Sequence, residues 1–296
     1  MAIFGKLAFE AGVGIVSLLL VRFALAGAVL GAAAALRPRR PRPRGRRLAL
    51  ALGLGAVGYT AQAALYFSAL ERIDAGLAAI LLYTFPGMVT IAAVALGRDR
   101  IDAVRVVALG LSFGGLVMVL FVGGPGELDT AGVALAFGAA IAYTAYILVS
   151  DTVVGEVDAL TLSALVCAGA TASLLVAGGV SGTLDFGFEA IGWLWLGALA
   201  LVSTVAAIAL FFAGLRRVGP SRASIISTVE PLVTVALAFA VFGERLSPLQ
   251  LAGAALVLAG VVVLQASSTR SATESRSAPG GGGGPRREPG PDLAGH

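Results

Sequence analysis

Two charged side chains fall deep inside apolar segments of the sequence, Arg22 and Glu230. A carboxylate in apolar surroundings must pair, face a polar cavity or carry a proton, so Glu230 is a candidate for solute contact or proton coupling. The alternative is a packing role in which Glu230 bonds Ser227 or Thr228. Arg22 could pair with Glu230 or bind a carboxylate or phosphate in a fork. Its alternative is donation to backbone carbonyls, or snorkelling toward an interface.

Uncharged polar residues also interrupt the apolar segments, and a few such groups among aromatic walls are typical of a solute cavity. A Tyr or Gln inside a span needs a partner outside its own helix, whereas Ser and Thr can bond their own backbone. The higher-ranked candidates to line a path are therefore Tyr59, Gln62, Tyr83 and Tyr143. The lower-ranked set is Tyr146, Ser203 and Thr204. The alternative for the tyrosines is an interfacial belt.

The sequence contains one histidine, His296, and one cysteine, Cys167. We therefore expect no histidine-based catalysis, no metal site, no cofactor and no internal disulfide. The nucleotide-binding pattern G-x-x-x-x-G-K-[ST] does not occur, so the chain has no ATPase of its own. A membrane-embedded hydrolase would need a nucleophile with a base or paired acids, and Glu230 is the one acid clearly inside a span. We predict that the chain is not an enzyme.

The composition is that of a helical protein that crosses a membrane several times. Hydrophobic residues make up 58% of the chain, mean hydropathy is +0.93, and charged residues are 13% against about 25% in soluble domains. The isoelectric point of about 9.7 reflects arginines in short loops, so nucleic acid is not an expected partner. The expected partners are a small-molecule solute and the lipid bilayer, with a homodimer left open.

Nine segments are long and apolar enough to cross a bilayer. They are Val13–Leu36, Leu48–Leu70, Ile73–Leu96, Val104–Val122, Ala131–Ser150, Leu160–Val180, Ile191–Gly214, Ala223–Phe242 and Leu249–Gln265. Residues 37–47 hold seven Arg and three Pro, which predicts a cytoplasmic loop. Alternation from that loop predicts a multi-pass protein of the cytoplasmic membrane with its C-terminus inside the cell. Residues 267–296 are rich in Ser, Gly, Pro and Arg and predict a disordered cytoplasmic tail.

A stretch of the sequence occurs twice. Ala64–Pro86 and Ala209–Pro231 lie 145 residues apart without a gap, and eight of 23 positions are identical. This register pairs Pro86 with Pro231, both candidates to break a helix, and pairs Phe85 with Glu230. The turn in the first copy is acidic and in the second is basic, which predicts that the copies sit upside down relative to each other. Such inverted repeats are an architecture of transporters.

The two copies end in motifs that resemble the EamA family of the drug/metabolite transporter superfamily. The motifs are a Pro midway in the fourth and ninth helices, the turn Gly243-Glu244-Arg245-Leu246-Ser247, a glycine-studded last helix, and the run Val21–Ala26. The resemblance implies an all-α membrane protein of ten helices in two inverted five-helix repeats, at 1–123 and 128–266. The first helix is represented only by Ala2–Phe9, so nine full spans are expected, through a late start site or a truncation.

What the resemblance implies for function is a central cavity between the halves that opens alternately to each side. We therefore expect a secondary active transporter of a small organic metabolite or drug-like solute, driven by a proton or solute gradient. The alternatives are a passive pore or structural membrane protein and, more weakly, a membrane-embedded hydrolase. The predicted substrate or coupling residues are those named above, with Glu230 and Arg22 first.

Overall fold

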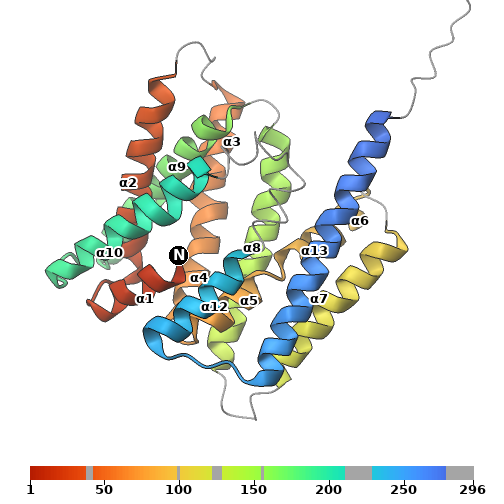
Figure 1. Cartoon of the computed structure of the whole chain (residues 1–296). Helices are drawn as coiled ribbons and strands as arrows, with labels where there is room; N and C mark the ends of the chain where they lie inside the picture. The colour runs from red at the N-terminus through yellow and green to blue at the C-terminus, as the bar shows by residue number, and fades with distance from the viewer. Residues whose placement is uncertain (38–42, 99–100, 122–128, 155–156, 211–228, 278–296) are drawn as a thin grey trace, which may run out of the picture.

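The computed structural model describes residues 1–37, 43–98, 101–121, 129–154, 157–210 and 229–277. Within those ranges the regular structure is helical, as Figure 1 shows. The α-helices are α1 (Ala2–Glu10), α2 (Ile15–Ala35), α3 (Arg46–Gly53), α4 (Thr60–Leu70), α5 (Ala75–Leu82), α6 (Phe85–Ala95), α7 (Ala103–Phe121), α8 (Thr130–Val154), α9 (Ala159–Ser181), α10 (Ala190–Ala200), α12 (Val229–Phe242) and α13 (Pro248–Ser277). Two π-helical segments, η1 (Leu54–Tyr59) and η2 (Leu201–Ala206), continue α3 and α10.

Eight helical stretches in the described residues are long and apolar enough to cross a membrane. They are Ile15–Ala35, Arg46–Leu70, Ala75–Ala95, Ala103–Leu120, Thr130–Ser150, Ala159–Ser181, Ala190–Leu210 and Pro248–Ala266. Each matches one of the predicted spans to within a few residues. The remaining predicted span, Ala223–Phe242, is described only as α12. The polytopic helical membrane fold is thereby confirmed.

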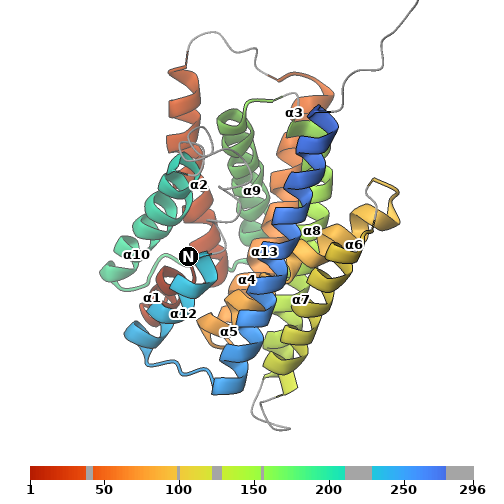
Figure 2. The same ribbon diagram turned by 45° about the vertical axis from the view of Figure 1, so that its right-hand side comes forward.

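Helices far apart in the sequence cross each other in antiparallel pairs. In the pair α7–α13, a Cβ on Gly115 would meet Gly253, and a Cβ on Gly260 would meet Ala108. Residues later in α7 therefore contact residues earlier in α13, so the two helices run antiparallel. Figures 1 and 2 show them side by side. Small residues allow this close approach, which is how helices associate without a hydrophobic driving force.

In α7, Gly110 and Gly114 have the GxxxG spacing that is typical of helix packing, but Gly115 makes the close contact with α13. A Cβ built on either meets no atom within 4 Å, whereas Gly115 is pressed against α13. That spacing cannot say which face of an apolar helix meets a neighbour, because the helix has no polar face to orient it.

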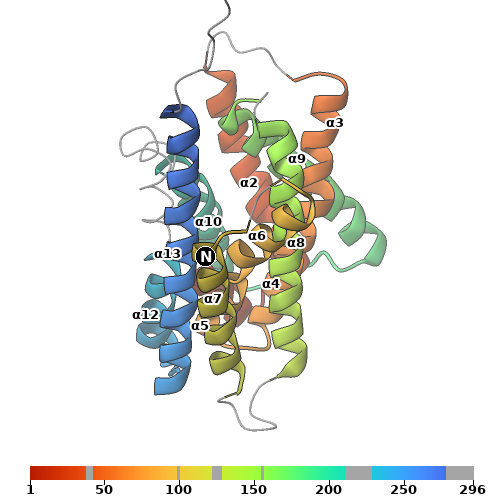
Figure 3. The same cartoon turned by 90° about the vertical axis from the view of Figure 1, so that its right-hand side faces the viewer.

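Two helix ends that carry an arginine lie together at one end of the molecule. The C-terminal end of α2, beside Arg37, lies at the same end of the molecule as Arg46 at the start of α3 and the C-terminal end of α13 (Figures 1 and 3). We call this the arginine end. The turns between α4 and α5 and between α12 and α13 lie at the opposite end. The arrangement agrees with the alternation on which the predicted topology rests.

Part of the predicted disordered tail, 267–296, is helical, and residues 278–296 lie outside the described part of the chain. Helix α13 continues to Ser277, so residues 267–277 are helical. A helix that already exists gains one hydrogen bond for each further residue that it fixes, which lets it extend past its apolar part. Composition alone underestimates this extension, because it takes no account of the turns already formed.

Candidate functional site

The span that contains Pro86 is broken, as its sequence predicted. Helix α5 ends at Leu82, α6 starts at Phe85, and Tyr83 and Thr84 lie between them. Pro86 sits in the first turn of α6, where its missing N–H leaves no bond unmade. The register-paired Pro231 is buried in the first described turn of α12, and the residues before it lie outside the described part of the chain.

The break in α5–α6 meets Glu230. The Tyr83 hydroxyl donates to Glu230 Oε2 at 2.8 Å, so the bond joins α12 to the two residues between α5 and α6. The Glu230 side chain is otherwise exposed. On the backbone, Thr234 Oγ1 donates to the Glu230 carbonyl at 3.0 Å. The alternative partners Ser227 and Thr228 lie outside the described residues.

Arg22 lies elsewhere, in the packed interior. It is 2% exposed, and its Nε donates to Thr204 Oγ1 at 3.1 Å. Its guanidinium carbon lies 5.2 Å from the ring centre of Phe23 and 5.7 Å from that of Phe67. Within the described residues no ion pair joins Arg22 to Glu230. Of the two functional hypotheses for Arg22, the pairing with Glu230 is therefore not seen, and this burial also argues against an arginine that snorkels toward an interface.

The residues that hold Arg22 come from the two π-helical segments. Tyr59 ends η1 and has a side-chain hydrogen bond with Arg22, while Thr204 lies within η2. A π segment widens the turn and leaves carbonyls for side chains to satisfy. Thr60 Oγ1 accordingly donates to Gly55 O at 2.8 Å, and Thr204 Oγ1 donates to Leu199 O at 3.2 Å. An arginine side chain can only donate hydrogen bonds. The Thr204 hydroxyl therefore accepts a hydrogen bond from Arg22 and donates one to the carbonyl of Leu199.

Thr204 has a partner outside its own helix, which its residue type alone does not predict. As a threonine it could bond its own helix, and it does so, but it also accepts from Arg22. A signal for this role was present, because the 145-residue register pairs Thr204 with Tyr59. Both members of that pair lie beside the same buried arginine.

A row of aromatic rings connects the surroundings of Arg22 with Glu230. Neighbouring rings have centroids 4.6–6.0 Å apart. In order the row is Phe23, Tyr59, Tyr146, Tyr143, Phe85 and Tyr83. The candidates Tyr59, Tyr83 and Tyr143 thus lie together, joined by Tyr146 from the lower-ranked set. Gln62 is 5% exposed on α4 and stands outside this row.

Besides the groups around Glu230 and Arg22, a third polar cluster lies toward the end of the molecule opposite the arginine end. Lys6 Nζ lies 2.6 Å from Glu244 Oε1, and Glu244 Oε2 accepts from the backbone N–H of Gly76 at 3.2 Å. Asp74 also lies 4.0 Å from Lys6. Lys6 and Glu10 have the i,i+4 spacing that allows an ion pair within α1. Instead Lys6 reaches across to Glu244, which belongs to the turn motif before α13.

The charges around this cluster shift the pKa of Asp74, which precedes the first residue of α5. Burial and the neighbouring Glu244 carboxylate raise the pKa of Asp74, although Lys6 acts in the other direction.

No group of three His, Cys, Asp or Glu side chains that could hold a metal ion occurs among the described residues.

Comparison with known proteins agrees with this architecture. The family model of the EamA-like transporter family matches residues 1–121 and 130–265. An uncharacterized transporter of Archaeoglobus fulgidus is 28% identical over 201 residues, 68% of this chain and 70% of that protein. The uncharacterized transporter YwfM of Bacillus subtilis is 30% identical over 159 residues, half of this chain and 49% of that protein.

A crystal structure titled only as that of a protein superposes with a TM-score of 0.62 at 20% identity. It covers 89% of this chain and 94% of the other, so it shows a shared fold. The family model spans both halves of the chain and nearly all of the described helices. The chain therefore belongs to the EamA-like transporter family.

Proposed function

We propose that the chain is a secondary active transporter that moves a small organic solute across the cytoplasmic membrane by alternating access. The proposal rests most on the hydrogen bond between Tyr83 and Glu230, because it joins a discontinuous helix to α12. Discontinuous helices are where many secondary transporters bind solutes and coupling ions. The C-terminus lies in the cytoplasm in this proposal, since the arginine end faces inward.

Glu230 is the coupling group in this mechanism. As a carboxylate it accepts a charge-assisted bond from Tyr83, which is about twice as strong as a neutral one. Proton uptake removes that charge and weakens the link between α12 and the break in α5–α6. Protonation is thereby connected to a movement of the helices on which the site is built.

Arg22 supplies the fixed positive charge of the site. A guanidinium carries five donors, so Arg22 has donors for a carboxylate or phosphate of the solute besides those used on Thr204 and Tyr59. The aromatic row between Arg22 and Glu230 offers an apolar wall for the rest of the solute. At the other end, Lys6 and Glu244 hold α1 against the turn before α13, and this ion pair breaks when the cavity opens to that side.

The test is transport by purified protein in liposomes, with a panel of labelled organic solutes screened by counterflow. A transporter exchanges labelled for unlabelled solute, whereas a pore only equilibrates it. With a solute that exchanges, we expect Glu230→Gln to reduce gradient-driven uptake at least tenfold and to leave exchange largely intact.

The matched control is Glu71→Gln, the same change in the exposed turn between α4 and α5. We expect it to alter neither activity. Equal loss of uptake and exchange in Glu230→Gln would contradict the coupling role. Equilibration without counterflow for every solute would instead favour the pore.

A further inference from the structure

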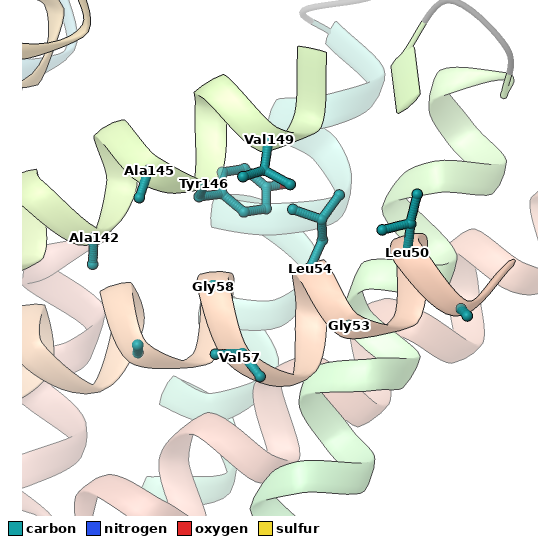
Figure 4. A pocket seen from close by; sticks show the side chains of 11 residues that line it. Leu50, Gly53, Leu54, Val57, Gly58, Ala142, Ala145, Tyr146 and Val149 are labelled. Atoms are coloured by element: carbon teal, nitrogen blue, oxygen red, sulfur yellow. The ribbon is translucent and has the colours of Figure 1, made fainter. Parts of the chain in front are cut away.

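An apolar groove lies along the outside of the helix formed by α3, η1 and α4, where this helix faces α8. Its volume is about 430 Å³, and Figure 4 shows Leu50 and Leu54 on one side and Tyr146 and Val149 on the other. Glycine and alanine residues make the hollow, among them Gly53. All the residues that line it are apolar except for the Tyr146 hydroxyl, so a polar solute finds little to bind there.

The length of the groove matches one leaflet of a bilayer. Its lining on the first helix runs from Ala49 to Ala61, which at 1.5 Å per residue is about 18 Å. Half of the hydrocarbon core is about 15 Å deep. Both walls belong to membrane-spanning helices, Arg46–Leu70 and Thr130–Ser150, and Val57 in the groove is 71% exposed. The groove is therefore open to the acyl chains of the surrounding lipid.

Positive charge stands at the end of the groove nearest the arginine end. Arg46 is exposed and precedes Ala49 and Leu50 by one helical turn, on the same helix face. Arg98, which follows α6, contacts the other wall of the groove: its Nη1 donates to the backbone carbonyl of Leu148 on α8, the neighbour of the groove residue Val149. One arginine thus lies a helical turn beyond the groove on its first wall, and a second contacts the backbone of its other wall beside Val149.

We propose that the groove binds an anionic phospholipid of the leaflet at the arginine end. One acyl chain lies between α3–η1–α4 and α8, and Arg46 and Arg98 contact the phosphate. Basic residues at the mouth of an apolar space between helices select anionic head groups. Because Tyr146 belongs to both the groove wall and the aromatic row, the bound lipid contacts the transport site from behind.

The test is native mass spectrometry of the full chain in detergent, titrated with phosphatidylglycerol or phosphatidylcholine. We expect one phosphatidylglycerol to be retained at least fivefold more tightly than phosphatidylcholine. Arg46→Gln and Arg98→Gln should each weaken phosphatidylglycerol binding by about fivefold and leave phosphatidylcholine unchanged. Arg72→Gln, which removes an exposed arginine at the opposite end, should change neither.

Filling the groove tests the acyl-chain part. A Cβ on Gly53 meets no atom within 4 Å, so Gly53→Leu should fold and exclude both lipids. Ala145→Leu fills the groove from α8 and is the second variant should Gly53→Leu prove unstable. The control is Gly110→Leu on α7, where a Cβ also meets no atom.

Several outcomes would overturn the proposal. One is equal retention of the two phospholipids by the unaltered chain, and another is retention of phosphatidylglycerol by a folded, groove-filled variant. A third is loss of solute exchange in Gly53→Leu with phosphatidylglycerol binding unchanged, which would make the groove an entrance for solute. Because lipid retention is measured without transport, a failed transport assay leaves this test intact.

Discussion

The buried Arg22 depends on Thr204 for a hydrogen bond that no apolar side chain can replace. We expect Thr204→Val to lower the free energy of unfolding by about 1–3 kcal/mol, because it leaves the Arg22 Nε without its acceptor. The measurement is thermal or denaturant unfolding in detergent. Thr144→Val is the matched control, since Thr144 is also buried and donates to its own helix at Ala140 O. Equal losses in both variants would contradict the role of Thr204.

Asp129 forms a pH-dependent contact with Arg72 at the end of the molecule that lies opposite the arginine end. The backbone N–H of Gly132, with those of Ala131 and the Arg72 side chain, holds the pKa of Asp129 below its usual range. A lowered folded-state pKa adds stability that is present above the unfolded-state pKa and is lost as pH falls through the folded-state value.

We therefore expect the unaltered chain to lose stability between about pH 5 and pH 3 more steeply than Asp129→Asn. The side-chain amide in Asp129→Asn can still accept hydrogen bonds from the backbone N–H groups of Ala131 and Gly132, but it has no charge to titrate. Melting temperature as a function of pH measures the difference. Parallel curves for the two proteins would show that Asp129 contributes nothing in this window.

The crossing of α7 and α13 depends on one glycine and not on its neighbour. A Cβ on Gly115 would overlap the backbone of α13 at Gly253, whereas one on Gly114 meets open space. We expect Gly115→Ala to destabilise the protein by about 1–3 kcal/mol. Gly114→Ala should be neutral or slightly stabilising, because alanine favours a helix. Unfolding of the two purified variants compares them, and a similar effect in both would refute the crossing.

The π-helical segments have a comparable role in placing side chains. Each widened turn directs a threonine hydroxyl onto a carbonyl five residues earlier, Thr60 onto Gly55 and Thr204 onto Leu199. Neither segment could be predicted from hydropathy, since a π turn and an α turn bury the same residues. Their positions in the chain nevertheless follow the 145-residue register to within two residues.

The two halves of the chain are joined at one end by Lys6 and Glu244. Their side chains are 19% and 8% exposed, so water screens the pair only in part. We expect a double-mutant cycle with Lys6→Met and Glu244→Gln to give a coupling free energy of about 1–3 kcal/mol. The control cycle is Arg72 with Asp129, which are 51% and 36% exposed and should couple by less than about 1 kcal/mol.

Equal coupling in the two cycles would mean that the pair of Lys6 and Glu244 does not tie the halves together.

The pair also explains why the turn before α13 contains an acid. Glu244 accepts from Gly76 at the start of α5, so it stabilises a helix N-terminus of the other half of the chain. The sequence had identified the turn as a family motif without giving it a partner.

Much of the fold could be predicted because the bilayer imposes it. Apolar length located the spans, and Pro86 marked the break between α5 and α6. The placement of a charge in an apolar segment of the sequence singled out Glu230 and Arg22 as residues that require partners. These features depend only on residues near one another in the chain, so the sequence by itself determined them.

Only the tertiary structure decided which polar groups meet. Arg22 bonds Thr204 and not Glu230, and Lys6 bonds Glu244 and not Glu10. A helix that is apolar all round carries no pattern that says which face turns toward a neighbour. That rotation is set by close contacts between backbones, as at Gly115, and it decides the partner of every polar side chain on the helix.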